Sequence, residues 1–284
     1  KPAPAAPAFK FDPDQPRAPA GPPGGGQWTD GGGGGGTGGG ASGSDGDGGS
    51  RLDPDRPVSK KPPAWKEKVE GVTKYWDTWN DTVTKLPGIT PMKRYVDGEI
   101  FAAEGGFDVD PSGAASGISH KLLNDIKAAV QIAPENHQEV LDIAKAAKPA
   151  DLSLEQRARV YQWYFNKRAM RTVGGGAALD QIEDKHSAAA FADVLFRDGG
   201  AGGTEIIQKA MNQTLTTIPE TERRQLNVPD AITADRAMGP EVFDTFKKLS
   251  NAGHGPKLRG HLSDLRRDNW PDERSRNDHF RFAP

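Results

Sequence analysis

One segment of the chain combines residue types that could perform acid catalysis. Glu104 stands at the end of an apolar helical run, and two glycines directly behind it break the helix. Two further carboxylates, Asp108 and Asp110, follow just before a tight turn. A half-buried Glu can hold a proton at neutral pH, and a helix end next to glycines leaves room for a polymer to approach. The pattern therefore indicates an acid catalyst that acts on a glycosidic bond.

Glycosidases commonly need a second group, which delivers water or traps the sugar, and the separation of the two carboxyl groups sets inversion or retention. Asp108 and Asp110 are the nearest candidates for this role. Either aspartate could instead cap the turn that contains Pro111, and the sequence leaves both interpretations open. A third candidate, Asp97, lies two helical turns before Glu104 on nearly the same face, about 10 Å away by the rise of a helix.

Glu104 also has a plain structural interpretation as an acidic residue at a helix C-terminus. An acid there is slightly unfavourable against the helix macrodipole, where Lys or Arg would stabilise the helix end. A choice made for stability alone would therefore not place Glu at this position, which is a small argument for a functional role.

The order of short motifs around this glutamate resembles a known family. Glu104-Gly105-Gly106 is followed by an Asp-Pro-x-Gly turn at 110–113 and by Gly-Ile-Ser at 117–119. This order is similar to family 108 of the glycoside hydrolases, the phage-type muramidases that cleave the glycan strands of peptidoglycan. The resemblance implies that Glu104 is the proton donor for the bond after N-acetylmuramic acid.

The resemblance implies further site residues. Muramidases of this family carry a helix rich in Tyr, Trp and Arg where this chain has Tyr161 and Tyr164. Together with Ser116 and Ser119, these tyrosines are the expected substrate-binding residues.

The loop after the Asp-Pro departs from the family pattern, which is usually Gly-Gly-x-Thr-x-Tyr-Gly-Ile. Here the loop is one residue shorter, with Ala115 where a Thr and Ser116 where a Tyr would fall. A hydroxyl that could hold water or sugar is therefore missing or changed. The alternative function is a catalytically inactive, phage-related structural or cell-wall-docking protein on a muramidase fold.

The expected fold class is mainly α, because apolar residues recur at helical spacing and no strand-like alternation stands out. By resemblance it is a lysozyme-like helical domain at 91–185 with a small, peptidoglycan-binding-like helical module at 186–250. Ser153 and Gln156 form a predicted capping box. Helices are expected at 64–86, 91–104, 122–130, 135–147, 154–168, 187–196, 206–211, 242–249 and, in the tail, through about 268, with a Gly-rich turn at 199–203.

Three further parts have distinct compositions. Residues 1–63 are Gly- and Pro-rich and are predicted to be a disordered tether, because they carry too little apolar surface to fold. Residues 64–90 form a Trp-rich amphipathic helix whose tryptophans could pack on the domain, stack on sugars or meet a partner. The tail at 251–284 mixes basic and acidic residues, which usually indicates a solvated surface.

The composition sets limits on partners. A formal net charge of −2 gives no electrostatic reason to expect nucleic acid, and no apolar run is long enough to span a membrane. The scattered histidines lack metal-ligand spacing, so neither a metal nor another cofactor is predicted. The expected partner is the peptidoglycan glycan strand. A phage or secretion-system protein could bind the N-terminal tether or the helix from Trp65 to Leu86.

The resemblance implies action on the bacterial cell wall, in the periplasm. An endolysin, a virion-associated protein and a secreted effector all fit it equally.

Overall fold

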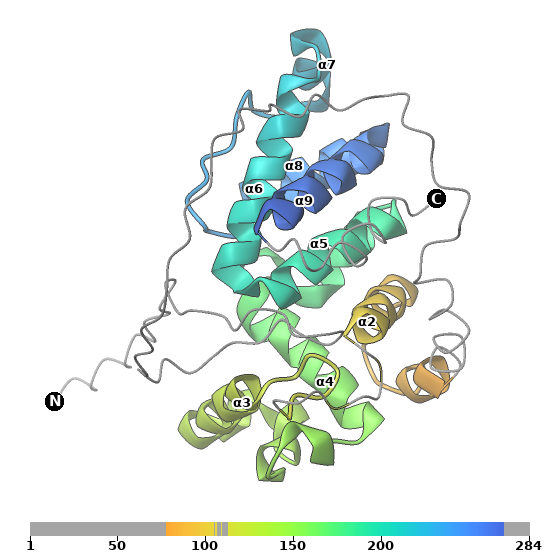
Figure 1. Ribbon diagram of the computed structural model, residues 1–284, viewed down its shortest axis with the longest axis vertical. Coiled ribbons are helices and arrows are strands. Elements are labelled where there is room, and N and C mark those ends of the chain that lie inside the picture. Colours follow the sequence, from red (N-terminus) through yellow and green to blue (C-terminus); the bar gives the residue numbers. More distant parts are fainter. Residues whose placement is uncertain (1–77, 105, 107–108, 110–112, 270–284) are drawn as a thin grey trace, which may run out of the picture.

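The computed structural model describes residues 78–104, 106, 109 and 113–269. In this part of the chain the regular elements are helices, and the only pairings of strand type are two isolated bridges, which join Ala115 to Val109 and to Ile118. The prediction of a mainly helical fold is confirmed (Figure 1). The predicted tether at 1–63 and the first part of the Trp-rich helix lie outside the described residues.

A helical segment at 78–83 comes first in the described chain. The helices that follow are α2 (Pro91–Ala103), α3 (His120–Ile132), α4 (Leu154–Tyr164), α5 (Lys185–Arg197), α6 (Gly199–Thr216), α7 (Glu220–Leu226), α8 (Pro240–Leu249) and α9 (Gly255–Asn269). Helix α6 is the long central element; α5, α8 and α9 pack beside it, and α3 lies at the opposite end from α7 (Figure 1).

Helix α2, which carries the candidate acid, begins where the sequence predicts. The Thr90 side chain accepts a hydrogen bond from the backbone N–H of Lys93, and Pro91 occupies the first turn, where its missing N–H costs nothing. Trp79 is fully buried and stacks on Phe101 of α2, with 4.7 Å between ring centroids. Trp79 therefore packs on the domain, which is one of the three interpretations of the Trp-rich helix given above.

Two other helix starts follow their capping residues. The Ser119 hydroxyl accepts from the backbone N–H of Leu122 at the start of α3. At the start of α4, Ser153 accepts from the N–H of Gln156 at 3.2 Å, and the Gln156 side chain accepts from the N–H of Ser153 at 2.9 Å. The predicted capping box is confirmed.

The predicted helix at 135–147 is wrong. The chain there forms three short 3-10 helices, Pro134–Asn136, Gln138–Val140 and Ile143–Lys145, and a fourth follows at Pro149–Asp151. The backbone leaves the helical region at His137, with φ of −134°, so the turns cannot join into one helix. Val140 and Ile143 are still fully buried. Their helix-like spacing arises because each side chain is buried from its own short 3-10 helix, and not from one continuous α-helix.

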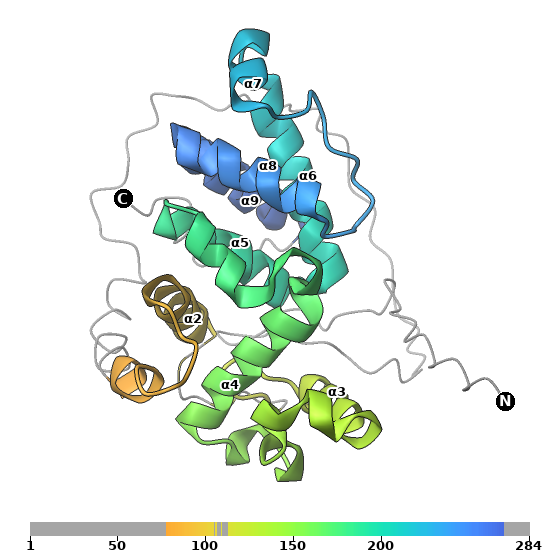
Figure 2. The ribbon, with the colours of Figure 1, turned by 180° about the vertical axis from the view of Figure 1, so that it is seen from behind.

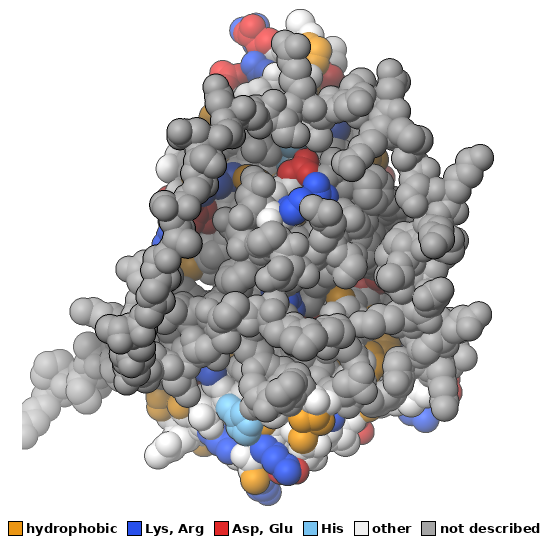
Figure 3. Space-filling view, viewed as in Figure 1, with side chains coloured by type: hydrophobic (Ala, Val, Ile, Leu, Met, Phe, Trp, Pro, Cys, Tyr) orange, Lys and Arg blue, Asp and Glu red, His pale blue; other side chains and the backbone are white. Residues whose placement is uncertain are grey.

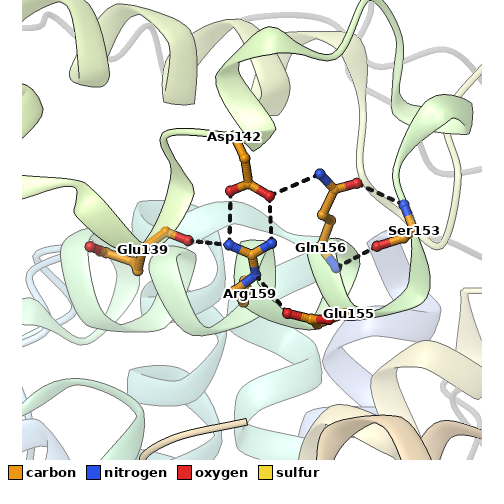
Figure 4. A network of polar contacts seen from close by, with 6 residues as sticks. All are labelled: Glu139, Asp142, Ser153, Glu155, Gln156 and Arg159. Carbon is orange, nitrogen blue, oxygen red and sulfur yellow. Dashed lines mark hydrogen bonds and ion pairs between the residues drawn. The ribbon is translucent and has the colours of Figure 1, made fainter.

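A polar network fastens this irregular segment to α4 (Figure 4). Arg159 donates two parallel hydrogen bonds to the Asp142 carboxylate, at 2.8 and 2.6 Å, and a third to the backbone carbonyl of Glu139. Gln156, the capping residue, donates to the same carboxylate at 3.0 Å. The hydrogen bonds from Arg159 and then from Gln156 lower the pKa of Asp142 to about 2, against an opposing effect of burial.

This network predicts an acid-dependent contribution to stability. Because the pKa of Asp142 is lower in the folded chain, its contribution is present above the ordinary value of about 4 and is lost as pH falls through about 2. We expect the wild type to lose about 1 kcal/mol more than Asp142→Asn between pH 4 and pH 2 in urea unfolding. The carboxylate is half exposed, so solvent screens most of the interaction. Glu155→Gln, which alters a looser contact to Arg159, should behave as the wild type. Parallel pH curves for wild type and Asp142→Asn would contradict this role.

The predicted Gly-rich turn at 199–203 is also wrong, because helix α6 already begins at Gly199. Gly199 itself has φ of +73°, which turns the corner from α5 into α6. A Cβ atom on Gly203 would lie 2.6 Å from the backbone oxygen of Val194 in α5. The glycines therefore allow the two helices to approach closely at their shared corner.

Two neighbouring glycines of α6 should respond oppositely to the same substitution. Gly203→Ala forces the α5 backbone away and is expected to destabilise the fold by about 1–3 kcal/mol. Gly202→Ala meets nothing within 4 Å and replaces a poor helix former, so it should stabilise by up to about 1 kcal/mol. Urea unfolding of both variants measures the difference. Equal effects would contradict the close α5–α6 contact.

The helix predicted in the tail is confirmed as α9, but the expectation of a solvated surface is wrong for two of its arginines. Arg266 is almost completely buried and pairs with Asp193 at 2.8 Å and with Asp198 at 3.1 Å, while Arg259 pairs with Asp184. All three aspartates flank or belong to α5. Leu258 and Leu262 of α9 are buried as well. Helix α9 lies on one side of α5 and α6, and α8 lies on the other (Figures 1 and 2).

The surface mixes charges. Acidic and basic side chains lie interspersed over α7, and basic, apolar and His side chains gather at the opposite end, near α3 (Figure 3). In the residues that the structure describes, no helix combines the length and the apolar character needed to cross a bilayer.

Candidate active site

Glu104 is the residue that ends α2. It caps the helix, and its backbone N–H donates to carbonyl oxygens of the last turn, including that of Ile100. Its side chain is only 9% exposed and forms an ion pair with Arg197 of α5, with 3.5 Å from Oε2 to Nη1. The Glu104 carboxyl group is therefore largely removed from solvent, as the sequence predicts. A cation at the C-terminal end of α2 also offsets the unfavourable dipole of an acid there.

Gly117 lies directly against Glu104. A Cβ atom on Gly117 would lie 2.6 Å from two carbons of the Glu104 side chain and 2.7 Å from Oε2, and the backbone has φ of +70°. Only glycine fits this position without moving the carboxylate. The Gly-Ile-Ser motif thus contributes a glycine whose missing side chain makes room for Glu104.

Ser116 holds the loop that brings Gly117 to this place. Its backbone has φ of +53°, and its buried hydroxyl donates to the carbonyl oxygen of Gly106 at 2.7 Å and accepts from Arg157 at 2.9 Å. Tyr161 donates to the Ser116 carbonyl oxygen at 2.6 Å. In this conformation the hydroxyls of Ser116 and Tyr161, two of the four expected substrate-binding residues, brace the loop.

A small pocket opens on the other side of this loop. Its volume is about 170 Å³, and its wall comes from the start of α3, the end of α4 and the corner between α5 and α6. The lining residues are Gly117, Ser119, Lys121, Leu122, Asp125, Tyr164, Arg168, Phe196, Gly199, Gly200 and Ala201. Two expected substrate-binding residues, Ser119 and Tyr164, belong to this set. Glu104 is not a lining residue, but it lies against Gly117, which is one.

The polar atoms of these two residues already have partners in the fold. The Ser119 hydroxyl caps α3, and the Tyr164 hydroxyl donates to the Leu195 carbonyl oxygen at 2.7 Å. The Tyr164 ring packs edge-on against Phe196, with 5.3 Å between ring centroids. Tyr164 therefore offers the pocket an apolar ring surface.

Of the three sequence candidates for a second carboxyl group, the structure describes one, Asp97. Asp108 and Asp110 lie outside the described residues. Asp97 is fully buried in α2 and paired with Lys93. Burial raises the pKa of Asp97 and lowers the pKa of Lys93, although each favours the charged form of the other. An enclosed, paired carboxylate does not reach solvent, so Asp97 cannot activate a bulk water in this conformation.

Four charged residues of the site were missed from the sequence: Arg197, Lys121, Asp125 and Arg168. Lys121 and Asp125 carry a readable signal, because positions four apart directly after Gly-Ile-Ser share one face of the predicted helix. Arg168 pairs with Asp125 on the pocket wall, and its guanidinium lies 5.9 Å from the ring centre of Trp163. Arg197 carries no such signal, since it meets Glu104 only through the packing of α5 on α2.

The arrangement consists of an enclosed carboxyl group, a glycine that lies against it, and a pocket with apolar rings and charged residues on its wall. Proton donation to a bound ligand fits these parts. Comparisons of the chain with protein-family models, with curated proteins and with solved structures found no match.

Proposed function

We propose that the protein is a peptidoglycan hydrolase of the muramidase type, with a lysozyme-like helical domain and with Glu104 as general acid. The observation that supports this most is the position of the Glu104 side chain, enclosed at the end of α2 and in contact with Gly117 on the pocket wall. The ordered motifs from Glu104 to Ser119 give the substrate class through the family resemblance.

In the proposed reaction Glu104 donates a proton to the glycosidic oxygen as the bond to N-acetylmuramic acid breaks. The carboxyl must first leave Arg197, because an ion pair favours the charged form of an acid. Binding of the strand at the pocket would supply this change. Asp108 and Asp110 remain the proposed candidates for the group that activates water or traps the sugar.

The second candidate function is a wall-docking or structural protein without turnover. Two observations favour it specifically. Arg197 gives the Glu104 carboxylate a structural role, and the hydroxyls of Ser116 and Tyr161 brace the loop. The chain would then retain a binding pocket while the acid stays charged.

One experiment separates the two functions. Purified sacculi are incubated with the protein, the bound fraction is measured by sedimentation, and the release of reducing sugar is measured in the supernatant. Hydrolysis requires release that increases with time and enzyme. Binding without release at any enzyme concentration would support the docking function and remove the hydrolase.

A further inference from the structure

The charged side chains of the pocket leave one cation without a partner. Arg168 and Asp125 pair with each other on the wall, so their charges largely cancel. Lys121 is half-buried and, among the residues that the structure describes, has neither an ion-pair nor a hydrogen-bond partner. The cavity therefore favours a ligand with negative charge.

Two helices begin at the same cavity. Lys121 and Leu122 lie in the first turn of α3, and residues 199–201 form the first turn of α6. The amides of a first turn have no partner within their own helix, and the macrodipole places partial positive charge there. Ser119 caps the start of α3, whereas no side chain caps the start of α6 in the described part of the chain. The wall at 199–201 therefore adds hydrogen-bond donors to the charge of Lys121.

Packing does not explain the glycine at position 200. Its φ lies outside the left-handed region that favours glycine, and a Cβ atom there would make an ordinary contact, 3.8 Å from the Cα atom of Ala169. Because glycine is a poor helix former, alanine would suit α6 better at this position. Gly200 does line the pocket, where a side chain would stand between a ligand and the helix amides. A ligand that approaches the backbone accounts for this glycine.

The rest of the wall and the volume limit the size of that ligand. The nearly buried rings of Tyr164 and Phe196 give the pocket an apolar surface. The volume of about 170 Å³ lies below the roughly 300–1,000 Å³ typical of pockets for drug-sized ligands. A charged group that is joined to one small organic unit suits this cavity.

We propose that this pocket binds a sugar phosphate, with Lys121 as the cation and the first turn of α6 as the amide donors. A phosphate group carries three terminal oxygens, so it can accept from Lys121 and from several amides at the same time. The sugar then lies against the rings of Tyr164 and Phe196. This assignment uses no catalytic residue, so it holds whether or not Glu104 acts as an acid.

The test compares three probes that separate the phosphate from the sugar. Binding of glucose 6-phosphate, glucose and inorganic phosphate to the full chain is measured by NMR titration at low ionic strength, where screening is weak. The wild type is expected to bind glucose 6-phosphate about tenfold or more tightly than glucose, since one charge-assisted hydrogen bond contributes about that ratio. Inorganic phosphate should bind more weakly than glucose 6-phosphate, because it does not use the rings.

Two pairs of matched variants assign the site. Lys121→Gln should lower the affinity for glucose 6-phosphate about tenfold, whereas Lys127→Gln, on α3 outside the pocket, should leave it unchanged. Gly200→Leu places a side chain in the cavity and should abolish binding. Gly202→Leu is its control, because Gly202 has open space around its Cβ position and does not line the pocket. Neither leucine variant should melt below the wild type.

Four outcomes would overturn the proposal. They are equal affinity for glucose 6-phosphate and glucose, inorganic phosphate that binds as tightly as glucose 6-phosphate, an affinity that Lys121→Gln or folded Gly200→Leu leaves unchanged, and no measurable binding by the folded wild type. None of these measurements depends on the release of reducing sugar from sacculi, so failure of the hydrolase and failure of this pocket assignment are distinguishable.

Discussion

Glu104→Gln is expected to lower the rate of reducing-sugar release from sacculi by about 100-fold or more. Gln keeps the shape of the side chain but cannot donate the proton that the leaving oxygen needs, and a general acid typically contributes 10²–10⁴ in rate. The rates are compared per folded protein, at a temperature well below unfolding of both chains. A variant as fast as the wild type would remove Glu104 from the mechanism.

The same substitution also weakens a nearly buried ion pair, so stability has to be measured beside activity. Glu104 and Arg197 have side chains that are 9% and 6% exposed, and losing this charge-assisted contact should cost about 1–3 kcal/mol. Arg197→Gln is the matched control, because it breaks the pair and leaves the carboxyl in place. It should lose similar stability while keeping turnover within about tenfold. Equal loss of turnover in both variants would assign Glu104 a structural role.

Arg266→Met is expected to have the largest effect on stability, a loss of about 3–5 kcal/mol. Arg266 is 3% exposed and lies between Asp193 and Asp198, which are equally enclosed. Removing this cation takes an ion-pair partner from two buried carboxylates in a low dielectric, which is strongly destabilising. For a folded body of this size, the melting temperature should fall by about 6–20 °C.

An exposed arginine provides the control for this variant. Arg224 pairs with Glu220 on α7, where both side chains are mostly exposed, so Arg224→Met should change stability by no more than about 0.5 kcal/mol. A shift for Arg266→Met as small as that for Arg224→Met would show that α9 is not clamped to α5 by these charges.

The sequence predicts the parts of the fold that local chemistry decides. The starts of α3 and α4 depend on Ser119 and Ser153, whose hydroxyls each accept from the amide three residues further along the chain. Helix α8 is present where the sequence predicts a helix at 242–249, although it begins two residues earlier, at Pro240, which is favoured in a first turn. Signals of this kind need no knowledge of the remaining chain.

The failures come from contacts between distant segments. The sequence predicts a turn at Gly203, because the close approach of Val194 that favours glycine there is not visible in the sequence. The buried side of α9 looks polar, since Arg266 finds its carboxylates only when α9 lies on α5. At 135–147 the spacing of Val140 and Ile143 fits a helix, yet the backbone at His137 does not.

The candidate site shows the same division. The place of Glu104 at a helix end beside glycines follows from its neighbours, whereas its partner Arg197 and the contact with Gly117 follow from tertiary packing. The bracing roles of Ser116 and Tyr161 could not be predicted, because they need the loop conformation at positive φ.

The central claim is that the chain cuts glycan strands with Glu104 as the acid, and the chemistry of the new chain ends tests it most directly. Sacculi treated with wild type or with Glu104→Gln are reduced with borohydride, hydrolysed and analysed for reduced amino sugars. We predict that the wild type creates new ends of reduced muramic acid and that Glu104→Gln creates none above untreated sacculi. New ends of reduced glucosamine, equal ends with both proteins, or no new ends with folded, sacculus-bound wild type would contradict the claim.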